Sequence, residues 1–240
     1  MNNNNSFEME EFTRSGLSMS AAFPALMRKV YVWMTLALAI TGITAYGVAT
    51  SPALLSLIFA SKATFFGLII AEFVLVFAIS GAINRLSLST ATLLFVLYSV
   101  VNGATLSSIF LMFSMTTIGK VFFITAGTFA VMAFVGYTTK TDLTSMGKLL
   151  FMALIGLIIA TVVNMFMKSA GFDLILSYIG VLIFVGLTAY DTQKIKHLMQ
   201  LAPDAGEHMQ KLALLGALTL YLDFVNLFLY LLRIFGNNKE

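Results

Sequence analysis

LALLGALTLYLDFVNLFLYLLRIF, from Leu212 to Phe235, is the stretch of sequence that decides the fold. It is long and apolar enough to cross a bilayer as an α-helix, which takes ~20 residues. It nevertheless carries a carboxylate, Asp223, near its middle. A charged side chain at bilayer depth costs roughly 2.5 to 3.5 kcal/mol, so such residues face the protein interior or a water-filled cavity. Asp223 is therefore the first candidate for a functional residue.

Polar residues recur along one face of this helix. Residues three or four positions apart share a helix face, and those that do so here are Gly216, Thr219, Asp223, Asn226, Tyr230 and Arg233. Small and hydroxylated residues are also common where membrane helices simply pack together. Packing is therefore the alternative interpretation for Thr219, Asn226 and Tyr230. It suits Asp223 poorly, because an ionisable group is a costly choice for packing.

The composition indicates an integral membrane protein. Of the 240 residues, 59% are hydrophobic and 10% are charged, whereas soluble domains usually carry ~25% charged residues. The alternating pattern of an outer-membrane β-barrel is not seen. Short connections between apolar segments predict a compact all-α bundle. Seven transmembrane helices are expected at about 30–50, 64–84, 90–113, 118–138, 147–168, 174–194 and 211–235, with the domain covering 28–236.

Two polar tails flank this domain. Residues 1–27 are expected to form a mobile cytoplasmic tail with at most a short interfacial helix near 20–27, and residues 237–240 a C-terminal tail. The first apolar run exceeds the 7 to 15 residues of a signal-peptide core, so we expect it to remain as an anchor. With the N-terminus in the cytoplasm, nine of the 14 basic residues lie inside and five outside. The positive-inside rule favours this orientation. The five outside are Lys62, Lys120, Lys168, Arg233 and Lys239. The protein is expected in the plasma (inner) membrane.

Several kinds of chemistry are disfavoured. The chain has no cysteine, and its two histidines, His197 and His208, lie in a polar loop without metal-ligand spacing. We expect no cofactor, no tight zinc or di-iron site and no nucleic-acid partner. Neither Asp191, in TAYDTQ, nor Asp223, in LYLDFV, has the Gly-x-Gly-Asp type of context of intramembrane aspartic proteases, so we do not expect an enzyme.

Four ionisable residues in or next to the predicted spans need an explanation. They are Glu72 in the second span, Arg85 at its inner end, Asp191 near the inner end of the sixth span, and Asp223. Each of the first three also has a structural interpretation. Asp191 could form a solvated pair with Lys194, Arg85 could be a topology anchor, and Glu72 could be buried through hydrogen bonds to another span.

Asp191 and Asp223 become a candidate gate if they meet. Two carboxylates in a site of low dielectric constant cannot both ionise cheaply, so they would share a proton. A proton, a metal ion or the Arg85 guanidinium could then compensate their charge. Oxygen ligands suit Ca²⁺, but two carboxylates fall short of the six to eight oxygens of a tight site, so binding would be transient. Asp223 lies ~18 Å of helix beyond Lys211, and a meeting therefore requires a raised helix start or a vestibule.

The third span contains a second polar stripe that includes Tyr98, Asn102 and Thr105. The small residues Gly103 and Ser107 beside it permit close helix approach. We interpret the stripe mainly as packing, with Asn102 as a further candidate to face a pore.

Two segments resemble the C-terminal signatures of the Bax-inhibitor-1 family, the transmembrane Bax-inhibitor-motif proteins. They are LTLYLDFVNLFLYLLRIFG, from Leu218 to Gly236, and GLTAYDTQKIK, from Gly186 to Lys196. NGATLS at 102–107 and the position of Arg85 add weaker support, and the likeness covers about residues 20–236.

The resemblance implies seven helices with the seventh at the centre, and a pH-sensitive leak of Ca²⁺ across the membrane. It also implies a di-aspartyl pair, Asp191 and Asp223, with Arg85 controlling closure and Glu72 as an intramembrane glutamate. Two rival functions remain open. One is a non-conducting regulator that binds a membrane protein such as a membrane-bound ATP-dependent protease, and the other is a cation/proton exchanger.

Overall fold

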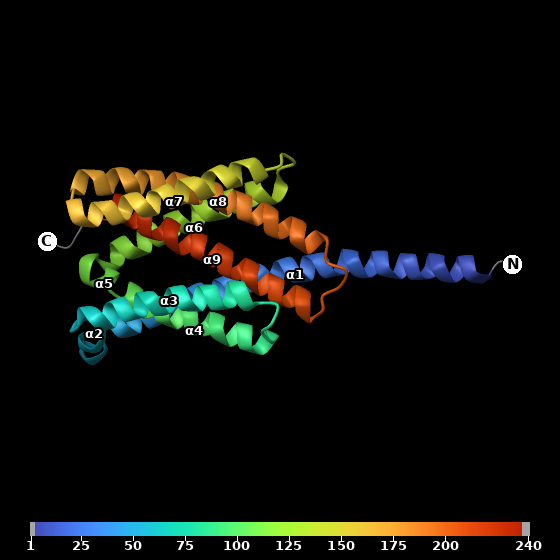
Figure 1. Cartoon of the computed structure of the whole chain (residues 1–240), viewed down its shortest axis with the longest axis horizontal. Helices are drawn as coiled ribbons and strands as arrows, with labels where there is room; N and C mark the ends of the chain where they lie inside the picture. The colour runs from blue at the N-terminus through green and yellow to red at the C-terminus, as the bar shows by residue number, and fades with distance from the viewer. Residues whose placement is uncertain (1–2, 237–240) are drawn as a thin grey trace.

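The computed structural model describes the backbone of residues 3–236 and the side chains of residues 22–236. The C-terminal tail predicted at 237–240 lies outside the described residues. In chain order the elements are α1 (Asn3–Ala49), α2 (Pro52–Phe59), α3 (Lys62–Ala82), α4 (Leu88–Leu106), α5 (Ile109–Met112), α6 (Met115–Thr138), α7 (Thr144–Met167), α8 (Ala170–Gln200) and α9 (Glu207–Phe235) (Figure 1).

The described residues contain seven helices that are long and apolar enough to cross a membrane. They are Ala22–Ala49 of α1, Leu88–Met112 formed by α4 and α5, and the whole of α3, α6, α7, α8 and α9. Each corresponds to one of the seven predicted spans, and the predicted all-α membrane bundle is therefore confirmed. The largest difference in extent is in α8 and α9, which continue past the predicted ends toward each other.

Helix α9 is the centre of the bundle, as Figure 1 shows. It packs against α8, α1, α6 and α4, and 67% of its most apolar window is buried, against 6% in α3 and 11% in α7. Helices α3 and α7 therefore lie at the periphery, where their apolar surfaces face lipid. The carboxylate of α9 lies inside protein because the helix that carries it is surrounded by other helices.

Serine side chains set the starts of several helices. A serine just before the first turn accepts a hydrogen bond from a backbone N–H that has no partner within the helix. The serines that do so are Ser51, Ser61, Ser87, Ser114 and Ser169, which precede α2, α3, α4, α6 and α8. These caps end the connections abruptly, so consecutive helices can run antiparallel as neighbours.

The close helix approach that the small residues of NGATLS permit is present between α1 and α4. A Cβ atom on Gly103 would lie 2.6 Å from the backbone oxygen of Thr41, which is closer than carbon and oxygen can approach. Only glycine fits at this position. The contact allows the Thr41 hydroxyl to donate a hydrogen bond of 2.9 Å to the backbone oxygen of Ser99 on α4.

The prediction of at most a short helix near 20–27 in the N-terminal tail is wrong. Residues 3–27 form the beginning of α1, which continues without a break to Ala49. The physical reason is that helix extension is easier than helix nucleation, and the membrane-spanning part of α1 supplies the nucleus. At ~1.5 Å per residue, the 47 residues of α1 extend to about 70 Å, so the helix projects beyond the bundle (Figure 1).

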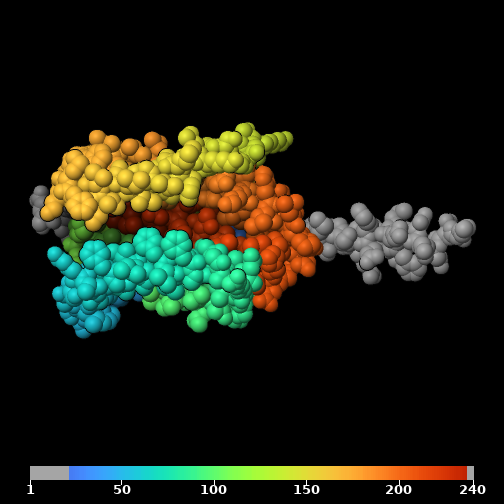
Figure 2. Space-filling model, viewed as in Figure 1, coloured from blue at the N-terminus to red at the C-terminus, as the bar shows by residue number. Residues whose placement is uncertain are grey.

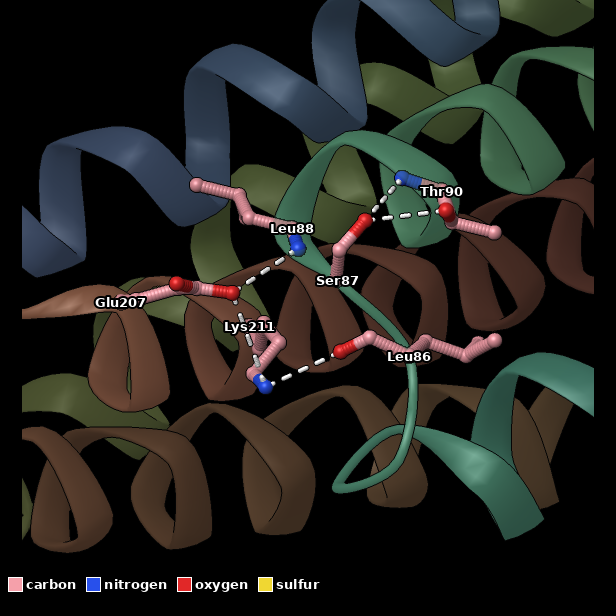
Figure 3. A network of polar contacts seen from close by, with 6 residues as sticks. All are labelled: Leu86, Ser87, Leu88, Thr90, Glu207 and Lys211. Atoms are coloured by element: carbon pink, nitrogen blue, oxygen red, sulfur yellow. Dashed lines mark hydrogen bonds and ion pairs between the residues drawn. The ribbon is translucent and has the colours of Figure 1, made fainter.

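Polar contacts tie the start of α9 to the α3–α4 connection (Figure 3). The Glu207 carboxylate accepts a hydrogen bond of 3.2 Å from the backbone N–H of Leu88, and Lys211 donates one of 3.0 Å to the backbone oxygen of Leu86. Glu207 and Lys211 also form an ion pair at 3.8 Å. One residue before Lys211, Gln210 accepts a hydrogen bond of 2.7 Å from Lys29 of α1.

Candidate functional site between α8 and α9

Asp223 is buried as the sequence predicts. Its side chain is 4% exposed, in the middle of the central helix α9. One carboxyl oxygen, Oδ2, is buried and receives no hydrogen bond from any described residue. A buried acceptor without a donor is costly, so Asp223 needs a proton, a cation or water at this position.

Asp191 of α8 lies within hydrogen-bonding reach of the Asp223 carboxyl group. Two carboxyl groups can hydrogen bond to each other only when one of them holds a proton. The sequence made a gate conditional on Asp191 and Asp223 approaching each other, and in this structure they do. The arrangement can hold or release a proton and can bind a small cation through oxygen atoms.

The lengths of α8 and α9 make this meeting possible. Helix α8 continues for nine residues after Asp191, to Gln200, and α9 begins at Glu207, sixteen residues before Asp223. At ~1.5 Å per residue these segments extend about 14 Å and 24 Å beyond the two aspartates. The sequence placed Asp223 deeper in the membrane than Asp191. The structure removes this mismatch through the raised start of α9, since both helices extend well past the aspartates.

A cavity of about 1020 Å³ lies beside the two aspartates. Its lining comes from α3, α7, α8 and α9, and both Asp191 and Asp223 belong to it. Figure 2 shows the hollow as a groove between α7 and α3, with α9 at its floor. The carboxyl pair is therefore accessible from a space that is large enough for ions, water or part of a larger molecule.

Three predicted supporting residues, Thr219, Asn226 and Tyr230, also line this cavity. The Thr219 hydroxyl donates to the backbone oxygen of Leu215 at 3.1 Å, and the Asn226 amide nitrogen donates to that of Leu222 at 2.8 Å. These two hydrogen bonds leave the Thr219 hydroxyl oxygen and the Asn226 amide oxygen as acceptors on residues that line the cavity. The polar stripe on α9 therefore supplies acceptors that suit a cation.

Beyond Tyr230 the space between α8 and α9 is filled. The Tyr230 ring stacks on Phe184 with ring centroids 5.8 Å apart, and it packs against Gly180, where a Cβ atom would lie 2.7 Å from the ring. Further along, Arg233 forms an ion pair with Asp173 at 3.5 Å. An aromatic stack and an ion pair thus separate the cavity from the end of the bundle where α9 terminates.

Glu72 and Asn102 form a second polar cluster, away from the aspartates. The side chains of Asn102 and Thr105 lie close to the Glu72 carboxyl group, while Glu72 Oε1 is buried without a hydrogen-bond partner among the described residues. Neither Glu72 nor Asn102 lines the large cavity. The structure therefore does not place these two predicted site residues beside Asp191 and Asp223.

Sequence reasoning missed the residues that link this cluster to α9. The hydroxyl of Tyr221, a fully buried residue, donates to Asn102 Oδ1 at 2.9 Å and lies 2.7 Å from the hydroxyl of Thr41. Tyr221 is two positions before Asp223, so it points to the opposite face of α9. The sequence signal that could have identified Tyr221 is its hydroxyl on the face of α9 opposite the polar stripe.

Arg85 does not approach the aspartates in this structure. It is exposed in the α3–α4 connection and does not line the cavity. The next residue, Leu86, contacts Lys211, which is twelve residues or about 18 Å along α9 from Asp223. Within the described part of the chain, ion pairs join Lys211 to Glu207 and Arg233 to Asp173. The expected pairing of Arg85 with an aspartate is not formed here.

Two lysines line the cavity instead, and sequence reasoning treated them only as topology markers. Lys194 is three residues after Asp191 on α8, and its ammonium lies 5.8 Å from the centre of the Tyr190 ring. Lys148 belongs to the beginning of α7. Both lysines are exposed.

The site offers oxygen ligands but no larger cluster of acidic or imidazole ligands. Among the described residues no group of three or more His, Cys, Asp and Glu side chains could hold a metal ion together. A cation at the pair would therefore take its remaining ligands from hydroxyl and amide oxygens or from water. Such a site favours brief contact over tight retention.

The C-terminal motifs around the two aspartates can now be compared with known proteins. Residues 24–240 match the family model described as "Inhibitor of apoptosis-promoting Bax1". This chain belongs to the Bax inhibitor-1 family. The match covers every membrane-spanning helix, so the resemblance inferred from two motifs extends to the whole domain.

Bacterial proteins of similar length are close relatives of this family member. The inner membrane protein YbhL of Escherichia coli K12 is 47% identical over 234 residues, which cover 96% of this chain and 100% of YbhL. An uncharacterized protein of Borreliella burgdorferi is 46% identical over 89% of this chain and 92% of its own length. One from Deinococcus radiodurans is 39% identical over 89% and 90%, respectively.

Proposed function

We propose that this Bax inhibitor-1 family member is a multi-pass inner membrane protein that lets Ca²⁺ move passively across the bilayer, with Asp191 and Asp223 as a proton-responsive gate. The observation that carries the proposal is the buried Asp223 oxygen without a donor, placed beside Asp191 at the wall of a large cavity. The seven spans and the name of the Escherichia coli relative support the location. A cytoplasmic N-terminus stays a prediction from the positive-inside count.

The gate would work through the charge of the carboxyl pair. With one proton shared, the two groups attract and hold α8 against α9. When that proton leaves, two negative charges lie close together in a poorly solvated site and repel each other. Separation of the helices or entry of a cation relieves the repulsion. A hard divalent cation such as Ca²⁺ suits the carboxylate and neutral oxygens along α9.

The arrangement of the cavity is consistent with a closed form. It contains lysines at one end and Tyr230 at the other, and the stack of Tyr230 on Phe184 blocks further passage. A path through the membrane would require α9 to shift relative to α8 so that this stack separates. Repulsion between Asp191 and Asp223 acts across the same pair of helices, and so could produce that shift.

The test is Ca²⁺ flux into proteoliposomes measured from about pH 6 to 8. The unmodified protein should show a downhill flux that changes with pH. Asp223→Asn removes one titrating group and places a neutral amide beside Asp191, so the flux should lose its pH dependence. If the purified protein shows no Ca²⁺ flux at any pH, the proposal is contradicted.

Asp142→Asn is the matched control. Asp142 is exposed in the α6–α7 connection, and hydrogen bonds from the hydroxyl and the backbone N–H of Thr144 hold its pKa below the usual value. A carboxylate with a lowered pKa is ionised above that pKa, so Asp142 stays charged from about pH 6 to 8. Its replacement should therefore leave the pH dependence of Ca²⁺ flux unchanged.

The same preparation distinguishes a channel from a cation/proton exchanger. An exchanger moves Ca²⁺ only with a fixed number of counter-transported protons. A leak continues when the internal and external pH are equal and clamped by an ionophore. We expect Ca²⁺ flux to persist under that clamp, and its complete loss would favour exchange.

One observation favours a second candidate function, a non-conducting regulator that binds another membrane protein. Helix α1 is more than twice as long as the ~30 Å bilayer core requires, and its first part projects beyond the bundle (Figure 1). A projecting helix is a suitable binding element for a membrane-bound ATP-dependent protease or another partner. Deleting residues 1–20 should then abolish the regulatory phenotype while leaving Ca²⁺ flux intact, and an unchanged phenotype would exclude this role.

A further inference from the structure

The cavity is open on the side that faces the membrane. Its lining includes Phe73 of α3 and several residues of α7, and these two helices are the least buried of the seven spans. Helix α3 packs on α4 and α7 packs on α8, so a groove remains between α3 and α7 (Figure 2). A groove between two lipid-facing helices can be entered from the bilayer without passing through water.

The groove walls are mostly apolar and exposed. Phe73 on α3 is 61% exposed, and Phe151, Met152 and Ile158 on α7 are 59%, 61% and 55% exposed. Inside a bilayer such side chains contact acyl chains. The volume of about 1020 Å³ is at the upper end of pockets that hold small molecules, roughly 300 to 1,000 Å³. An acyl chain would therefore suit the volume of the groove and its apolar walls.

Two lysines lie at one end of the groove. Lys148 and Lys194 both line the cavity, and neither forms an ion pair within the described residues. Three carboxylates are also close, Asp142, Asp191 and Asp223. None of them comes within ion-pair distance of Lys148 or Lys194, so both ammonium groups remain available to a phosphate.

We propose that this groove binds one anionic phospholipid, with its phosphate between Lys148 and Lys194 and an acyl chain between α3 and α7 against α9. Basic pockets between transmembrane helices bind anionic headgroups elsewhere, and here the apolar groove continues directly from the lysines. A soluble phosphate would satisfy the lysines but leave the apolar walls uncovered. The inference goes beyond the proposed ion flux and does not depend on it.

Binding can be tested with phosphatidylglycerol as the probe. The full chain is reconstituted in nanodiscs of phosphatidylcholine with a minor fraction of phosphatidylglycerol, and lipids retained by the protein are counted by native mass spectrometry. Each lysine beside an anionic lipid contributes a factor of about five in affinity. The double variant Lys148→Gln/Lys194→Gln should therefore retain phosphatidylglycerol roughly 30-fold more weakly. Lys62→Gln/Lys120→Gln removes the same charge outside the groove and should have little effect.

A second variant tests the apolar part separately. Met152→Trp fills the groove while both lysines remain, and it should also reduce retention of phosphatidylglycerol. Phe166→Trp is the matched control, because Phe166 is 84% exposed on the same helix and does not line the cavity. Circular dichroism in the same nanodiscs confirms that each variant is folded.

The outcomes separate a lipid from a free anion. Retention that depends on the lysines and on Met152, and that is unaffected by added inorganic phosphate, supports the proposal. Competition by inorganic phosphate with no effect of Met152→Trp would show a soluble-anion site and overturn it. Equal retention of phosphatidylglycerol and phosphatidylcholine by the unmodified protein would also overturn it.

Discussion

Tyr221 and Asp223 give the central helix a polar group on each of two opposite faces. Asp223 faces Asp191 and the large cavity, whereas Tyr221 binds Asn102 and Thr41. The two contacts hold α9 from both sides at nearly the same depth. A shift of α9 that separates the aspartates must therefore also change the Tyr221 hydrogen bonds, so the tyrosine restrains the proposed gate.

The restraint predicts an effect on stability. Tyr221→Phe removes a hydroxyl that is buried between two polar side chains and leaves Asn102 Oδ1 without its donor. Hydrogen bonds between membrane helices contribute about 0.6 to 2 kcal/mol, so the thermal midpoint of the purified protein should fall modestly. Tyr178→Phe, at a residue 54% exposed, is the control and should leave the midpoint unchanged. An equal midpoint for Tyr221→Phe would show that the contact contributes nothing.

At the level of elements, the start of α9 is anchored to parts of the chain that lie far away in sequence. Glu207 and Lys211 contact the α3–α4 connection (Figure 3), and Gln210 contacts Lys29 of α1. The other end of α9 forms the ion pair with α8. The central helix is thus attached at both ends, and the aspartate pair lies between these attachments.

Lys211→Met should loosen the anchored end. Only 12% of the Lys211 side chain is exposed, and methionine keeps much of its apolar stem while removing the donor to the Leu86 oxygen. We expect faster hydrogen exchange of the backbone amides in the first turns of α9, with the centre around Asp223 unaffected. Lys120→Met, at an exposed lysine of α6, is the control. Unchanged exchange at the start of α9 would argue against the anchor.

For the whole molecule, hydropathy and helical periodicity were sufficient to predict seven spans and a buried Asp223, because both follow from the cost of placing polar groups in lipid. The central position of α9 and the pairing of the aspartates were inferred with help from the family resemblance. Long-range contacts such as Lys211 with Leu86 could not be predicted, since they depend on how the helices pack.

The structure differs from the sequence interpretation where one local pattern permits several outcomes. Arg85 was assigned to the gate because topology places it on the same side as Asp191, but a shared side does not fix a distance of many ångströms. The N-terminal segment was expected to be a mobile tail because it is polar, yet helix continuation from α1 overrides composition. Lys148 and Lys194 were overlooked because an exposed lysine has no distinctive pattern until the groove beside it is known.

The central claim is that Asp191 and Asp223 titrate as one unit that controls Ca²⁺ movement. A double-mutant cycle tests it most directly, with Ca²⁺ flux followed against pH in proteoliposomes for the unmodified protein, Asp191→Asn, Asp223→Asn and the double variant. Residues that act as a unit are strongly non-additive. The account predicts that each single variant abolishes the pH dependence and that the double variant changes nothing further, whereas partial effects that add in the double variant would contradict it.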